Sequence, residues 1–140
     1  MDNYNLDKEK EEALSAARRA LESLEDTKNA LISAKNWGIA DMFGGGTFIS
    51  LIKHSNLDSA RNAANRAYRD IRILERELRD VSIDLDLNIE IGALMTALDF
   101  FSDNLFMDYL VQRKINEAIA KIDGAIDIIK QIQRRITFNK

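Results

Sequence analysis

The chain has 140 residues, of which 46% are hydrophobic and 31% charged, with a net charge of −3 and neither proline nor cysteine. This length fits one domain with one core, so residues 1–140 are taken as a single domain. The lack of cysteine excludes disulfides, zinc-thiolate sites and iron–sulfur clusters. A proline-free chain with this much charge favours long amphipathic helices over a β-sandwich or barrel. We therefore expect an all-α fold.

The distribution of charge limits the classes of partner. The 20 basic and 23 acidic residues are interleaved along the chain. This mixture gives no electrostatic reason to expect nucleic acid or an anionic membrane surface as the main partner. The polar N-terminal stretch has no apolar core of the kind found in signal peptides. The most apolar run, 91–111, contains three aspartates, each of which costs roughly 2.5–3.5 kcal/mol near a membrane centre. No membrane span and a cytoplasmic location are expected.

Heptad spacing predicts a first long helix, beginning near Asn5 or Asp7 and ending near Asn36. Lys28 occupies one core position of its seam. The apolar members of that seam are Leu14, Ala17, Leu21, Leu24 and Leu31.

A second long helix is predicted from Ser55 or Asn56 to about Val81. Its seam has small residues first and large ones last, whereas the alanines of the first helix precede its leucines. If the two helices run antiparallel, leucines face alanines throughout, an arrangement that close-packed interiors favour. The seam consists of Leu57, Ala60, Ala64, Ala67, Ile71, Leu74, Leu78 and Val81.

Residues 81–92 change period, because apolar and polar residues alternate there as in a strand. No second strand is visible for it to pair with. Two interpretations remain open: an extended strap along the bundle, or a lone strand that pairs with its copy in a dimer. The strap is the preferred one.

The helical period returns at Ala93. A shorter helix is predicted, with one face formed by Leu94, Leu98, Phe101, Leu105 and Phe106. A last long helix is predicted over 108–137. That last helix has a broad isoleucine and alanine stripe, which predicts contact with more than one neighbour. The predicted fold is therefore an antiparallel helical bundle of three long helices plus one or two short helices.

The glycine-rich corner at 37–55 is the candidate ligand- or partner-binding site. Backbone N–H groups of a glycine-rich loop that leads into a helix can bind an anion. The phosphate-loop pattern G-x-x-x-x-G-K-[ST] is absent, and a turn between long helices needs glycine in any case. A structural corner is thus the favoured interpretation. The candidate binding residues are Trp37, Asp41, Gly44, Gly45, Gly46, Lys53 and His54.

The corner also carries a resemblance. The pattern W-G-x-x-D-x-x-G-G-G at 37–46, followed by K-H-S at 53–55, resembles that of a family of small bacterial helical proteins with no assigned activity. That family has a later aromatic–acidic block, which is matched more loosely by 99–109, where Ser102 and Asn104 stand in place of an aromatic residue and a glycine. The resemblance implies that the corner and this block belong together.

No other group of residues predicts chemistry. The single histidine, His54, cannot supply the paired Glu-x-x-His motifs of a di-iron bundle. The run Asp84-x-Asp86-x-Asn88 lacks the glycine and glutamate of a calcium loop. Asp99, Asp103 and Asp108 are interpreted as solvent-facing or capping residues, and the arginines of the second helix as a solvated face. We expect no catalytic residue, no metal and no cofactor.

The predicted function is a non-enzymatic interaction or scaffold module that self-associates or binds a protein partner. The last helix and the segments 48–52 and 100–106 offer more apolar surface than a thin bundle covers, and such patches mark interfaces. The alternative is a small-ligand module that binds an anion or metabolite at the glycine-rich corner.

Overall fold

The computed structural model describes residues 3–36 and 56–138, and the all-α prediction is confirmed for them. No strand occurs within these ranges, and short turns separate the later helices. The helices are α1 (Asn3–Asn36), α3 (Asn56–Leu85), α4 (Asn88–Phe100), α5 (Asp103–Val111) and α6 (Ile115–Phe138).

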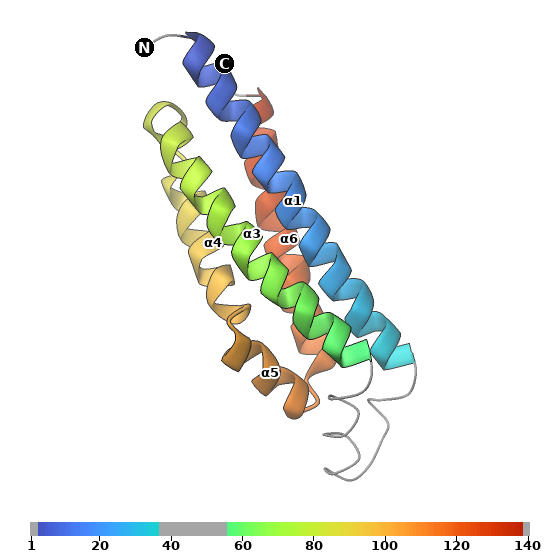
Figure 1. The fold of residues 1–140 in the computed structure, drawn as a ribbon. Helices are drawn as coiled ribbons and strands as arrows, with labels where there is room; N and C mark the ends of the chain where they lie inside the picture. The colour runs from blue at the N-terminus through green and yellow to red at the C-terminus, as the bar shows by residue number, and fades with distance from the viewer. Residues whose placement is uncertain (1–2, 37–55, 139–140) are drawn as a thin grey trace.

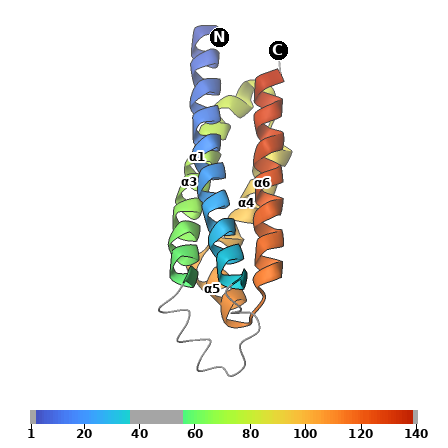
Figure 2. The ribbon, with the colours of Figure 1, turned by 90° about the vertical axis from the view of Figure 1, so that its right-hand side faces the viewer.

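The helices run alternately down and up around a common core (Figure 1). α1 and α3 lie side by side in opposite directions, α4 descends beside α3, α5 continues across the lower end, and α6 returns to the end where α1 starts. The view from the side shows α1 between α3 and α6, with α4 behind them (Figure 2). α4 and α5 together take the fourth position of the bundle.

Two polar contacts fix the register of α1 against α3. The hydroxyl of Ser23 donates a hydrogen bond to the carboxylate of Asp70, and the guanidinium of Arg66 lies 3.6 Å from the carboxylate of Asp26. In this register the alanines that begin each helix face the larger residues that end the other. The buried residues of this interface are Ala13, Ala16, Ala17, Ala20, Leu24 and Leu31 on α1, and Ala60, Ala64, Ala67, Ile71, Leu74, Leu78 and Val81 on α3.

α6 joins α1 through both packing and charge. Lys28, at a core position of the heptad, is only half-buried, and its ammonium group lies 2.7 Å from the carboxylate of Asp123. This hydrogen bond is the main reason that the pKa of Lys28 is raised above its ordinary value of 10.5. The contact therefore adds stability at neutral pH, and that stability is lost only as pH rises through the raised pKa.

The prediction of a strap or strand over 81–92 is wrong. Residues 81–85 belong to α3 and 88–92 to α4, with Asp86 in the left-handed region at φ 52°. The N–H of Asp86 bonds to the carbonyl of Ser82, which is an αL helix cap made by an aspartate. The apparent alternation is the meeting of two helices: Leu87 is buried and Ile89 is exposed, so the apolar residues do not share one face.

The predicted start of the last helix near Asp108 is also wrong. Asp108 belongs to α5, which ends at Val111, and α6 begins only at Ile115. Arg113 has φ 62°, and two hydrogen bonds close the end of α5 there: Arg113 N–H to Leu110 O, and Lys114 N–H to Tyr109 O. This pair of bonds is a Schellman cap, in which glycine normally takes the left-handed position. An arginine there gives no signal in the sequence.

The facing of large and small residues predicts the effect of exchanging sizes across the α1–α3 interface. Leu74→Ala should lower the free energy of unfolding by about 2–5 kcal/mol, because it leaves a cavity in a fully buried region. Adding Ala17→Leu should recover part of the loss by filling that space. Chemical denaturation measures both, and Leu105→Ala, the same change at an exposed position, is the control. Failure of the double variant to exceed Leu74→Ala would contradict the facing of these two positions.

Candidate functional site: the groove between α4 and α6

All residues of the predicted glycine-corner site lie outside the described residues. They are Trp37, Asp41, Gly44, Gly45, Gly46, Lys53 and His54.

The other charged candidates lie at the surface. Asp99 is exposed, as expected of a solvent-facing carboxylate. Asp108 is exposed too, but the prediction that it caps the last helix is wrong, because it lies within α5 and α6 begins at Ile115. Asn88 donates a hydrogen bond of 3.1 Å to the carboxylate of Asp86, so these two residues close the turn between α3 and α4. The arginines that were interpreted as a solvated face are all exposed, namely Arg61, Arg66, Arg69, Arg72, Arg76 and Arg79.

The sequence did not predict an open groove that lies between α4, α5 and α6 and has a volume of about 650 Å³. Most of its lining is aliphatic or aromatic, and a few polar groups stand among these residues. The lining consists of Ala93, Thr96, Ala97, Phe100, Tyr109, Glu117, Ala120, Lys121, Gly124, Ala125 and Ile128. We call it the α4–α6 groove.

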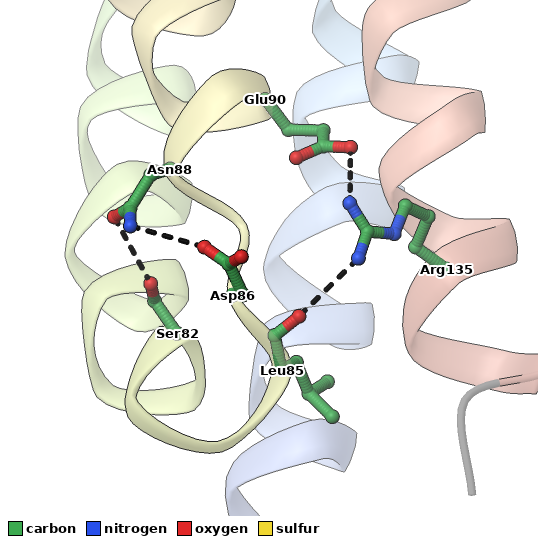
Figure 3. A network of polar contacts seen from close by, with 6 residues as sticks. All are labelled: Ser82, Leu85, Asp86, Asn88, Glu90 and Arg135. Atoms are coloured by element: carbon green, nitrogen blue, oxygen red, sulfur yellow. Dashed lines mark hydrogen bonds and ion pairs between the residues drawn. The ribbon is translucent and has the colours of Figure 1, made fainter.

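One end of α4 is clamped to α6 by an ion pair (Figure 3). The guanidinium of Arg135 lies 2.6 Å from the carboxylate of Glu90 and donates a second bond, of 3.3 Å, to the carbonyl of Leu85. Glu90 is 7% exposed, and its other carboxylate oxygen, Oε1, is buried without a hydrogen-bond partner among the described residues. Arg135 thus ties the α3–α4 turn to α6 through a buried charge.

The other end of α4 is held by aromatic rings. Phe100 makes edge-to-face contacts with three rings, at centroid distances of 5.0 Å to Phe101, 5.7 Å to Phe106 and 5.1 Å to Tyr109. This is a favourable geometry for ring quadrupoles. The cluster fixes the corner between α4 and α5, and it explains the aromatic part of the 99–109 block as structural.

Between these two fixed ends, small side chains leave the groove unfilled. Ala93 and Ala97 on α4 and Ala120 and Gly124 on α6 are each four residues apart, so each pair lies on one helix face. A Cβ atom added to Gly124 would meet nothing within 4 Å. Nothing in the packing of the described residues therefore requires a glycine at this position.

The charged groups of the groove are two exposed side chains of α6. Glu117 and Lys121 are both exposed, lie one helical turn apart on α6, and form no ion pair or hydrogen bond within the described ranges. The hydroxyl of Thr96 is used within α4, donating to the carbonyl of Gly92 at 3.1 Å. No group of three residues that could hold a metal ion is found in the described part, and no nucleophile–base pair lines the groove.

Exposed apolar side chains stand on the same helices. The prediction that 100–106 contributes surplus apolar surface is largely wrong, because Phe100, Phe101 and Phe106 are buried. α4, by contrast, is apolar on most of its circumference. The large exposed hydrophobic residues are Ile89 at 84%, Met95 at 38%, Leu105 at 40%, Val111 at 50% and Phe138 at 77%.

Sequence reasoning missed this groove because it sought chemistry in glycine-rich and charged motifs. The available signal was the pair of small residues four apart on each of two apolar helices, Ala93 with Ala97 and Ala120 with Gly124. That signal is weak, because alanines four residues apart also occur in the α1–α3 interface, where side chains of the facing helix cover them.

Comparison with known proteins gives no further assignment. No protein-family model, curated protein or solved structure matches the chain. None of the described helices combines the length and apolar character that crossing a membrane requires.

The ion pair between Arg135 and Glu90 predicts the effect of removing the arginine side chain. Arg135→Ala should lower the free energy of unfolding by about 2 kcal/mol, because it leaves the buried carboxylate of Glu90 without its partner. Arg134→Ala, at the exposed neighbouring position, should change it by less than about 0.5 kcal/mol. Thermal or chemical denaturation measures both, and equal effects would show that the clamp contributes nothing specific.

A second prediction concerns the acidic end of the α1–α3 pair. Burial, followed by the charges of Glu12 and Asp80, raises the pKa of Glu77 above its ordinary value of 4.5, although Arg19 opposes the shift. A raised pKa means that the ionised form weakens the fold, so this contribution to stability declines as pH rises from 4.5 through the raised value.

Glu77→Gln should therefore stabilise the protein at pH 7 by roughly 0.2–0.5 kcal/mol, and this gain should vanish below the ordinary carboxyl pKa. Glu75→Gln is the control, because Glu75 forms an ion pair with Arg79 and its loss should not stabilise. Denaturation at several pH values between about 3 and 8 gives the comparison. A gain from Glu77→Gln that persists at the lowest pH would contradict the assigned cause.

Proposed function

We propose that this protein is a non-enzymatic interaction module that self-associates through the face containing the α4–α6 groove. The observation that carries the proposal is an open, mostly apolar groove whose floor is built from small side chains. Small residues let the backbone of another helix approach closely, and large side chains of a partner can fill the space above them.

The surroundings of the groove support a protein partner. α4 is apolar on most of its surface, and a helix of that kind is ordinarily buried. Met95, on the same helix, remains 38% exposed. Apolar surface of this kind beside a groove is characteristic of interaction sites. In this proposal, the long antiparallel helices act as a rigid scaffold that presents the groove, in the cytoplasm.

A small-ligand module is the second candidate, and the groove volume favours it. About 650 Å³ lies within the range of roughly 300–1,000 Å³ that is typical of small-molecule pockets. The glycine-rich corner at 37–55 is the other proposed ligand site, for an anion or metabolite. The resemblance carried by that corner adds no activity to either function. A thermal-shift screen with phosphates and carboxylates tests this candidate, since a ligand of the folded state raises the melting temperature.

Filling the groove tests the proposed function. Gly124→Leu places a large side chain in open space, so the fold should be unchanged or more stable by about 0.5–1 kcal/mol, because glycine disfavours a helix interior. Self-association should nevertheless weaken by at least about tenfold, which corresponds to 1.4 kcal/mol. Sedimentation velocity over a concentration series measures association, and denaturation measures stability.

Asn62→Leu is the matched control, since it adds the same side chain at an exposed position of α3 far along the chain from the groove. It should leave association unchanged. A wild-type protein that stays monomeric throughout the concentration series would overturn the proposed function. Association that is equally sensitive to both substitutions would place the interface elsewhere.

A further inference from the structure

We infer that the solvent-facing side of α3 is a docking surface for an acidic protein segment that carries carboxylates along one side of a helix. This surface, which we call the arginine face, is separate from the α4–α6 groove, because none of the groove-lining residues belongs to α3. The inference therefore goes beyond the proposed function and is tested separately from it. The arginine face consists of Arg61, Arg66, Arg69, Arg72, Arg76 and Arg79, together with Asn62 and Asn65.

The structure separates charges that the sequence interleaves along α3. Between residues 59 and 79, every exposed residue is an arginine, an asparagine or a serine, whereas the three carboxylates in this range are all partly covered. Asp70 accepts a hydrogen bond from Ser23 of α1, and Glu75 pairs with Arg79 on the same helix. Glu77 interacts with charges of α1. The outer side of α3 thus presents positive charge without negative charge, although the net charge of the chain is −3.

Three arginines at the centre of this face have no anionic partner within the described ranges. Arg69, Arg72 and Arg76 follow one another at intervals of three and four residues, so their side chains stand along one line on the helix. Arg72 lies 5.9 Å from the ring centroid of Tyr68, and no ion pair or hydrogen bond of the three guanidinium groups is found among the described residues. Like charges at these intervals repel each other, so a line of anions bound to all three relieves that repulsion.

The width and the borders of the arginine face favour a protein segment over a nucleic acid. The face is one helix wide, since α1 packs on one side of α3 and α4 on the other (Figure 1). Carboxylates of α1 border it: Asp26 lies 3.6 Å from Arg66, and Glu12 lies near the later part of α3. These carboxylates repel the phosphates of a polyanion wider than the face. Tyr68, the one aromatic residue of α3, is half-buried beside Arg72, so the face offers no exposed ring on which the bases of a single strand stack.

The side chains of the face also fit carboxylates. A planar guanidinium donates two parallel hydrogen bonds to one carboxylate, which a lysine cannot do. Arg69 and Arg76 are about 10 Å apart along the helix axis, at 1.5 Å per residue. A partner helix with glutamates or aspartates at the same intervals of three and four residues presents a matching line of negative charge over that length. The partner chemistry that complements this face is therefore a narrow, acidic helix side.

A pair of designed peptides tests the inference. The probe is a labelled synthetic helix with glutamates at intervals of three, four and three residues, and its control has the same composition with the glutamates spread around the helix. The 140-residue chain should bind the probe at least about tenfold more tightly than the control peptide. Binding should weaken as salt is added, because the arginines are exposed. Fluorescence anisotropy measures both effects.

Substitutions locate the binding on the protein. The triple variant Arg69→Gln, Arg72→Gln, Arg76→Gln should bind the probe at least about tenfold more weakly. The corresponding triple change to glutamate should instead bind a helix with lysines at the probe's glutamate positions. The matched control removes three positive charges at exposed positions of α1 and α6, and it should change probe binding by less than about twofold. Its substitutions are Arg18→Gln, Lys130→Gln and Arg134→Gln.

The melting temperature of each variant shows that it is folded, since all the substituted side chains are exposed. Absence of probe binding, equal binding of the two peptides, or equal losses in the two triple glutamine variants would each overturn the inference. A single-stranded oligonucleotide that binds more tightly than the probe, through the same three arginines, would assign the face to nucleic acid and overturn it as well. None of these results bears on self-association through the α4–α6 groove, which Gly124→Leu tests.

Discussion

The fold depends on the matching of large side chains with small ones between α1 and α3. Alanines fill the first half of each seam and larger aliphatic residues the second half, so only an antiparallel arrangement fills the interface evenly. Ser23 with Asp70 and Asp26 with Arg66 mark the register that results. Because this pair is straight and well filled, it supports α4 on one side and α6 on the other.

In the α4–α6 groove, by contrast, the matching of large side chains with small ones is incomplete. Small residues stand on both helices there, as they do in α1 and α3, but no large side chains oppose them. Arg135 with Glu90 joins α4 to α6 near one end of the groove, whereas the rings around Phe100 join α4 to α5 near the other end. In the proposed function, a helix of the partner supplies the missing volume.

The sequence predicted those features that depend on periodicity. Every described apolar seam position of α3 is buried, and the all-α class follows from the same pattern. The sequence did not predict the helix ends at which a residue other than glycine takes the left-handed conformation, at Asp86 and at Arg113. The groove was missed because an empty space depends on distances between helices, and these arise from contacts such as Arg135 with Glu90 that join distant parts of the chain. The glycine-rich corner stays a prediction.

The open groove beside α4 has a consequence for motion. Segments that make few packing contacts along their length open with a lower free energy than the global unfolding reaction, often as one cooperative unit. Leu94 and Leu98 of α4 are buried, but Ala93 and Ala97 of the same helix line the open groove, whereas the seam between α1 and α3 is buried along its length. Amide protons of α4 and α5 should accordingly exchange with solvent earlier than those in the middle of α1 and α3. The bundle would then behave as a stable helical pair carrying a more labile two-helix arm.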